Sequence, residues 1–232
     1  MSRFDIVMHY SYSAIMFIGA VTFFIWSQKP RGVSKGEYII AMIIPLWSGT
    51  AYLSIALGQG VLQEPDQTIY FARYLDWVVT TPLLLLALAL TAMFYEPKKD
   101  KALIGGLITA DVFMILTGLI ADFSNDTLKY VWYGLGIAAL LIVLYIIWYP
   151  LRKMADKSGD GLKRHYRRMA AYLTSFWVLY PTAWVLGPSG VGAFEEVMEI
   201  TAFIVLPILS KLGFTLLDLK GLRELRTPGV DA

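Results

Sequence analysis

Apolar stretches long enough to cross a membrane alternate with short polar segments along almost the whole chain. A helix needs about 20 mostly apolar residues to span a hydrocarbon core of about 30 Å. Seven stretches meet this requirement, at about 6–26, 38–58, 71–94, 102–121, 128–149, 169–187 and 198–219. They leave no room for a separate soluble domain. The pattern predicts an all-α membrane protein in which residues 1–232 form one domain, a seven-transmembrane-helix bundle.

The composition supports a membrane protein and excludes a soluble globular domain. Hydrophobic residues make up 57% of the 232 residues and charged residues only 16%, well below a soluble domain. The first stretch carries His9, Tyr10 and Tyr12 and has no small-residue cleavage site, so we interpret it as a spanning helix rather than a signal peptide. The chain has no cysteine, which excludes disulfides. No metal-ligand spacing, phosphate loop or hydrolytic triad is visible, and we expect neither a bound metal nor an enzyme.

Lysine and arginine gather on alternate connections between the predicted helices. Sixteen of the twenty lie in the first, third and fifth connections and in the C-terminal tail: Lys29, Arg31, Lys35, Lys98, Lys99, Lys101, Arg152, Lys153, Lys157, Lys163, Arg164, Arg167, Arg168, Lys220, Arg223 and Arg226. Cytoplasmic loops carry such an excess. We therefore expect a multi-pass protein of the cell (plasma) membrane, with its N-terminus outside and its C-terminus in the cytoplasm. Membrane orientation accounts for the basic fifth connection, so we expect no nucleic-acid partner.

Lys211 is the only charged residue in the stretch 200–217. A lysine at the centre of a membrane costs roughly 2.5–3.5 kcal/mol on insertion scales and is a functional candidate by default. Its amine can pair with a buried acid or form a Schiff base with a carbonyl compound. Asp76 supplies a matching acid in the apolar third stretch. The two residues predict a covalent chromophore with a counterion.

The other ionisable residues predict a column through the membrane. With the expected orientation, its members run inward in the order Glu199, Arg73, Asp76, Lys211 and Asp218, with Glu37 beside the inner end. Seven residues is close to two helical turns, so Lys211 and Asp218 share a helix face. Because Asp76 is a neighbour of Arg73, we expect these two to form an internal pair. Asp218 and Glu37 lie near the headgroups, and the pattern leaves open whether they function or are solvated helix-end carboxylates.

Further polar and aromatic residues lie at membrane depth. We interpret Asp111 and Thr117 as interhelical hydrogen-bonding residues and His9 as an interfacial polar residue. Trp177, Tyr180 and Trp184 share one face of the sixth stretch, and Trp77 lies in the third. A stripe of this kind is more often plain packing. Its depth, close to that of Lys211, favours a flat, conjugated ligand held between indole rings.

Three motifs resemble one known family, the microbial (type I) rhodopsins, which are seven-helix photoproteins that bind retinal. The string RYLDWVVTTP at 73–82 resembles the family's counterion motif. The pattern WxxYPxxW at 177–184 resembles its sixth-helix motif, and SKLGF at 210–214 resembles its retinal-lysine signature. The likeness covers essentially the whole chain.

Pro207 lies four residues before the lysine, at the position where outward proton pumps carry a second aspartate. A proline at this position resembles a hallmark of the xenorhodopsin group. The resemblance implies that Lys211 carries retinal as a protonated Schiff base and that Asp76 is its principal counterion. It also implies a set of residues that line or abut the pocket: Trp77, Trp177, Tyr180, Trp184, Tyr52, Thr80, Met114 and Pro207. Trimers or dimers are the family's usual assemblies, in membrane lipid.

The resemblance leaves two functions to weigh. Ala87 occupies the position of the proton donor in outward pumps and holds no proton. Asp218 provides an acid on the cytoplasmic side of Lys211. We therefore expect a light-driven inward proton pump, in which Asp218, Glu37 or water accepts the proton and Asp76 and Arg73 serve the return from outside. The alternative is a sensory rhodopsin, a photoreceptor that signals to a soluble cytoplasmic transducer.

Overall fold

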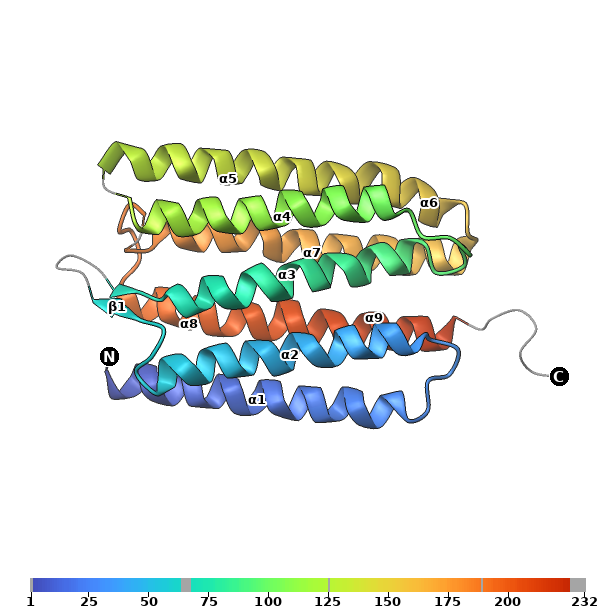
Figure 1. Cartoon of the computed structure of the whole chain (residues 1–232), viewed down its shortest axis with the longest axis horizontal. Helices are drawn as coiled ribbons and strands as arrows, with labels where there is room; N and C mark the ends of the chain where they lie inside the picture. Colours follow the sequence, from blue (N-terminus) through green and yellow to red (C-terminus); the bar gives the residue numbers. More distant parts are fainter. Residues whose placement is uncertain (1, 64–67, 125, 189, 226–232) are drawn as a thin grey trace.

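The computed structural model describes residues 2–63, 68–124, 126–188 and 190–225. Its helices run side by side along one long axis (Figure 1). Within the described residues, seven helical segments are long and apolar enough to cross a membrane. The predicted seven-helix bundle is thus confirmed. Arg226, the last residue of the basic set in the sequence, lies outside the described residues.

The first four spans and the sixth are single helices, whereas a π-helical turn interrupts the fifth and the seventh. The first four are α1 (Arg3–Ser27), α2 (Lys35–Ala56), α3 (Phe71–Ala92) and α4 (Lys101–Asp122). The fifth comprises α5 (Asp126–Ile146), a π-helical turn (Ile147–Leu151) and α6 (Arg152–Asp156); the sixth is α7 (Asp160–Leu186). The seventh comprises α8 (Glu196–Pro207), a second π-helical turn (Ile208–Gly213) and α9 (Phe214–Glu224). Between α2 and α3, β1 (Leu62–Gln63) pairs antiparallel with β2 (Thr68–Ile69).

Polar residues extend several helices beyond the apolar stretches. α1 begins at Arg3 because the Ser2 side chain caps it by accepting a hydrogen bond from the Asp5 N–H, and Asp5 bonds back to the Ser2 N–H. α7 begins at Asp160, nine residues before the predicted span. Its first turns are helical but basic, so the apolar pattern did not include them. Hydropathy detects the part of a helix that lies in lipid, whereas capping and hydrogen bonding set its ends.

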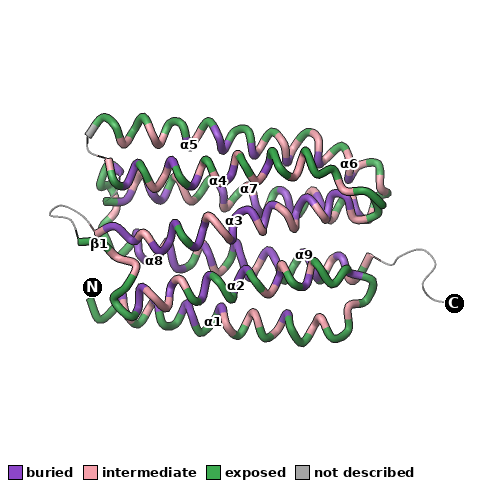
Figure 2. The backbone as a smooth tube through the Cα atoms, in the orientation of Figure 1, coloured by how far each residue is buried: buried purple, intermediate pink, exposed green. Residues whose placement is uncertain are grey.

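Burial shows which surfaces face the lipid. α3 is the most buried of the spanning segments, and Figure 2 shows buried positions along it and exposed ones along α1 and α5. The exposed positions carry apolar side chains, among them Ile18, Val21, Leu141 and Ile142. A surface of this kind is stable in lipid, where no hydrophobic penalty applies, and would be an aggregation hazard in water.

The connections alternate between the two ends of the bundle. The α1–α2, α3–α4 and α6–α7 connections and the end of α9 lie together at one end (Figure 1). These segments carry the basic residues of the sequence pattern, and we call this the basic end. The N-terminus, the β-hairpin and the α4–α5 and α7–α8 connections lie at the opposite end, which we call the hairpin end.

Candidate functional site

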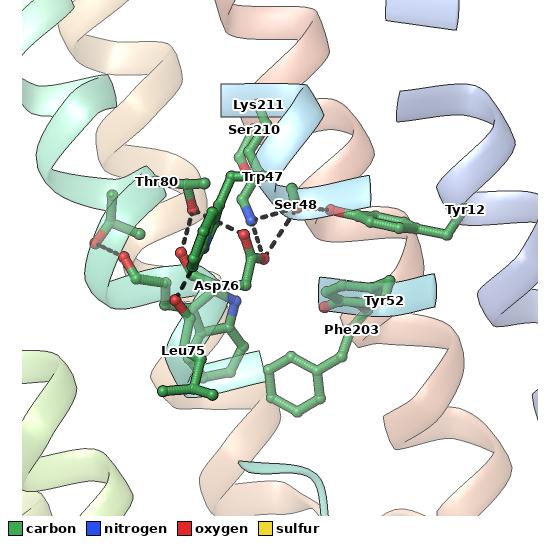
Figure 3. Close-up of polar contacts among 12 residues, drawn as sticks. Tyr12, Trp47, Ser48, Tyr52, Leu75, Asp76, Thr80, Phe203, Ser210 and Lys211 are labelled. Carbon is green, nitrogen blue, oxygen red and sulfur yellow. Dashed lines mark hydrogen bonds and ion pairs between the residues drawn. The ribbon is translucent and has the colours of Figure 1, made fainter. Parts of the chain in front are cut away.

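Lys211 and Asp76 meet in the middle of the bundle. The Lys211 ammonium forms an ion pair with Asp76 Oδ2 and donates a 2.9 Å hydrogen bond to Ser48 Oγ (Figure 3). Lys211 is 1% exposed and Asp76 0%. Because each charge would be costly to bury alone, each stabilises the other in place. The predicted pairing of a buried amine with a buried acid is confirmed.

Hydroxyl groups hold the Asp76 carboxylate from two further directions. Ser48 Oγ donates to Asp76 Oδ2 at 3.0 Å, and Thr80 Oγ1 lies 3.2 Å from Asp76 Oδ1. Tyr12 Oη lies 2.6 Å from Ser48 Oγ, and since the Ser48 proton points to Asp76, Tyr12 is the donor. Sequence reasoning missed Ser48 and Tyr12 as site residues. A hydroxyl in an apolar span gives no signal of its own, because it can equally bond to its own helix.

A π-helical turn carries Lys211. Ile208–Gly213 follows Pro207 directly, and π-turns inside α-helices are frequent at functional sites. Two tyrosines of α7 support the turn: Tyr180 Oη is hydrogen-bonded to Ser210 Oγ at 2.9 Å, and Tyr172 Oη donates to the Leu209 carbonyl at 3.0 Å. The position of the lysine is thus fixed by α7 as well as by its own helix.

An aromatic cavity of about 110 Å³ lies between α3, α4, α5 and α7. Its walls are Tyr74, Trp77, Thr81, Met114, Ile115, Gly118, Tyr133, Gly136, Ile137, Leu140, Trp177, Tyr180, Pro181, Trp184 and Phe203. Five of the sequence-predicted pocket residues are among them: Trp77, Met114, Trp177, Tyr180 and Trp184. Three others lie off the cavity: Thr80 contacts Asp76, Tyr52 stacks on Tyr12 with ring centroids 3.9 Å apart, and Pro207 precedes the π-turn.

The cavity and the lysine together fit retinal, the group that the sequence implies. The cavity wall is almost entirely apolar and aromatic, as a flat polyene requires. Tyr180 belongs to the wall and also hydrogen-bonds Ser210, the residue beside Lys211, so the cavity ends close to the amine. Asp76 supplies a negative charge for a protonated nitrogen at that point.

Arg73 does not pair with Asp76, and that prediction was wrong. Arg73 Nη1 lies 3.8 Å from Glu199 Oε1, and its guanidinium lies 4.0 Å from the centre of the Tyr70 ring. Lys211 and hydroxyl groups already occupy both oxygens of Asp76. Because Arg73 lies almost a helical turn nearer the hairpin end, it meets the acid at the start of α8 instead.

His9 is 0% exposed; its ring stacks against those of Tyr52 and Tyr70, and its Nδ1 donates to the Asp5 carbonyl at 2.7 Å. Its position at the membrane interface stays a prediction. The prediction for Thr117 was wrong. Thr117 donates to the Met114 carbonyl of its own helix rather than to a neighbouring one.

Asp111, by contrast, forms the predicted interhelical bond. Thr81 Oγ1 of α3 donates to Asp111 Oδ2 of α4 at 2.6 Å. Thr81 also lines the cavity, so the bond joins α3 to α4 at the cavity wall.

Asp218 lies in a polar cluster near the basic end. It is 4% exposed, Thr91 Oγ1 lies 3.0 Å from both of its carboxylate oxygens, and His165 Nε2 lies 2.9 Å from Oδ1. The solvated alternative is therefore excluded for Asp218. Glu37 is half-buried on α2, close enough to Asp218 to interact electrostatically. Sequence reasoning missed Thr91 and His165, since only packing brings α3, α7 and α9 together.

Another acid near the hairpin end was also missed. Asp122, at the end of α4, accepts hydrogen bonds from Tyr74 Oη at 2.8 Å and from Trp184 Nε1 at 2.9 Å. Both donors line the aromatic cavity. In the sequence this residue has the pattern of a helix-end carboxylate and gives no sign of its two partners.

Comparison with known proteins agrees with this geometry. The family model for bacteriorhodopsin-like proteins matches residues 3–225. Archaerhodopsin-2 of Halobacterium sp. (strain aus-2) is 36% identical over 210 residues, covering 86% of this chain and 78% of that protein. Sensory rhodopsin-2 of Natronomonas pharaonis is 28% identical over 212 residues, covering 91% and 86%.

A solved structure, that of the light-driven proton pump LR (Mac) from Leptosphaeria maculans, superposes with a TM-score of 0.89 at 28% identity and 97% coverage of both chains. The family therefore includes both pumps and sensors. The chain itself belongs to the bacteriorhodopsin-like family of microbial rhodopsins, as a multi-pass protein of the plasma membrane that binds retinal covalently, as a Schiff base, at Lys211.

Proposed function

We propose that this protein is a light-driven inward proton pump of the xenorhodopsin group. The supporting observation is the position of Asp218, a buried acid on the lysine's own helix between Lys211 and the basic end. The excess of basic residues marks that end as cytoplasmic. A proton that leaves the Lys211 nitrogen toward Asp218 moves inward.

Retinal supplies the absorption of light and the isomerisation that changes the orientation and proton affinity of its link to Lys211. The residues around that link hold its charge in the dark. Asp76 faces the Lys211 nitrogen, Ser48 donates a hydrogen bond to one carboxylate oxygen, and the Thr80 hydroxyl lies 3.2 Å from the other.

The path from Lys211 to the basic end favours Asp218 over any group on α3. Ala87 packs beside Leu84 and Leu88 in the apolar core and has no group that can hold a proton. Thr215 lies four residues after Lys211 and three before Asp218, on the same face of the helix. Its buried hydroxyl has no hydrogen-bond partner among the described residues, so it is available to a water between the two.

Return of a proton to Lys211 must then come from the hairpin end. A small second cavity there is lined by Arg73, Glu199 and Asp122 together with aromatic residues. Its polar groups can hold water on the side of Asp76 that faces away from Asp218. In this proposal Arg73 and Asp76 guide the returning proton, as expected from the sequence.

The second candidate is a photosensor that signals to a soluble cytoplasmic transducer. The observation that favours it is the exposed basic surface of α7, where Arg164 and Arg168 are available to a partner. Membrane orientation already explains that charge, so we place this function second. In either role the protein sits in membrane lipid, and we propose a trimer or dimer.

The test of direction is the external pH of an unbuffered suspension of cells that contain the retinal-loaded protein. Under illumination, alkalinisation that a protonophore abolishes is the expected result. Asp218→Asn should reduce the initial rate strongly, whereas Glu37→Gln should leave it close to that of the wild type. Acidification would reverse the proposed direction. An unchanged pH, from a pigment that still completes its photocycle, would favour the sensor.

A further inference from the structure

The Asp218 carboxylate joins three helices of the bundle. Thr91 of α3 and His165 of α7 both reach it on α9, the histidine through Nε2 at 2.9 Å from Oδ1. The side chains of His165 and Asp218 are 10% and 6% exposed. Both side chains are largely shielded, the imidazole slightly less than the carboxylate.

The absence of a side chain at Gly221 leaves room for the His165 imidazole. A Cβ atom at this position would lie 2.1 Å from His165 Cε1 and 2.3 Å from Nδ1, far inside van der Waals contact. The backbone of Gly221 does not have a positive φ, so space rather than conformation requires the glycine. Any side chain here would push the ring away from Asp218 without removing it from the protein.

Other charged groups face the cluster from neighbouring elements. Glu37 of α2 interacts electrostatically with Asp218 and with Lys99 of the α3–α4 connection. Lys99 lies outside the spanning helices, where partial burial lowers the pKa of its amine, and it donates to the Met93 and Glu96 carbonyls. Among the described residues, only Thr91 and His165 form hydrogen bonds with Asp218.

We propose that His165 is the proton-releasing group of this pump, paired with Asp218, and that the exit path runs between α7 and α9 rather than through Glu37. The inference rests on the inward transport proposed above. In the dark the pair is a carboxylate beside a doubly protonated imidazole. Arrival of a proton on Asp218 removes the negative charge that stabilises the imidazolium. The imidazolium then loses its Nδ1 proton to cytoplasmic water.

The protons of the pair balance over one cycle. The pair holds two protons in the dark, both on the imidazole, and three after one arrives from Lys211. Release from Nδ1 returns the count to two. The imidazole then turns so that its unprotonated Nδ1 faces Asp218, and transfer of the Asp218 proton to that nitrogen restores the ion pair. The proton that leaves is therefore not the one that arrived, and no other reactant is needed.

The test follows two signals after a light flash, using retinal-loaded protein in lipid vesicles. Infrared difference spectra report protonation of Asp218, assigned by its loss in Asp218→Asn. A pH indicator reports the proton in bulk water on the cytoplasmic side. His165→Gln keeps a hydrogen-bond donor for Asp218 but has no group that can take up and release a proton. It should leave the arrival at Asp218 unchanged and slow release by about 100-fold or more, the usual range for loss of a general acid.

Four controls distinguish a role of His165 in proton transfer from a purely structural role. Gly221→Ala keeps the histidine but displaces it, and should also slow release, whereas Gly106→Ala, which adds its Cβ in open space, should not. Glu37→Gln should release at the wild-type rate. Added imidazole should restore release in His165→Ala, because it can occupy the space that the missing ring leaves beside Asp218.

Each outcome decides a different point. Wild-type release in His165→Gln, or slow release that imidazole does not restore, would overturn the role of His165 and leave inward pumping intact. Slow release in Glu37→Gln alone would move the exit path to α2. A wild-type protein that never protonates Asp218 would remove both the proposed function and this inference.

Discussion

The hydroxyl of Tyr52 donates a 2.8 Å hydrogen bond to the carbonyl oxygen of Phe203, 151 positions later in the chain. In an uninterrupted α-helix this carbonyl would accept from the N–H of residue 207. That residue is a proline, which has no N–H. Tyr52 thus satisfies a buried acceptor that Pro207 leaves open, one turn before the π-turn that carries Lys211.

Tyr52→Phe should lower the stability of the retinal-loaded protein by about 1–3 kcal/mol, the cost of an unsatisfied buried carbonyl. Thermal denaturation, followed by loss of the pigment's absorption, measures the effect. The matched control is Tyr145→Phe, which removes the hydroxyl of an exposed tyrosine. Adding Pro207→Ala to Tyr52→Phe should restore part of the loss, since alanine returns an N–H. Equal melting temperatures for Tyr52→Phe and wild type would refute this role.

Lys211→Ala should abolish visible absorption when retinal is added, because among the described residues no other buried amine stands beside Asp76 to form the link. The absorption spectrum of purified protein checks this. Lys220→Ala, in which an exposed lysine is removed from the same helix, should keep its colour. A coloured Lys211→Ala protein would mean that the chromophore is attached elsewhere.

Asp76→Asn should shift absorption to longer wavelength. A neutral amide stabilises the positive charge at the Lys211 nitrogen less than a carboxylate does, which narrows the gap between ground and excited states. Asp111→Asn tests the neighbouring buried acid, which bonds Thr81 rather than the lysine, and should shift the spectrum less. If the two variants have equal maxima, Asp76 is not the principal counterion.

Asp122→Ala should destabilise the protein by about 2–4 kcal/mol, because it leaves two buried donors, Tyr74 Oη and Trp184 Nε1, without this acceptor. Thermal bleaching should be faster as the cavity wall loosens. Asp122→Asn keeps one acceptor oxygen and should lose less stability. Glu224→Ala, at an exposed position on α9, serves as the control. Stability unaffected in Asp122→Ala would show that other contacts hold these rings.

Much of the site could be predicted because its residues can be recognised from their own segment of the sequence. Lys211 and Asp76 stand out as isolated charges in apolar stretches, and their cost in lipid demands a partner. Helical spacing alone predicts that one helix face carries Trp177, Tyr180 and Trp184. The same reasoning failed for Arg73, because it considered neighbours along the chain and not the acid that α8 brings to it.

The sequence by itself determined the seven spans and the buried lysine with its acid, since lipid allows only segments that are apolar and satisfy their own backbone. Tertiary structure decided which polar groups meet. Ser48 reaches Asp76, His165 reaches Asp218 and Tyr52 reaches Phe203 only when separate helices pack. Hydropathy sums over a segment, whereas a hydrogen bond depends on two atoms coming within about 3 Å.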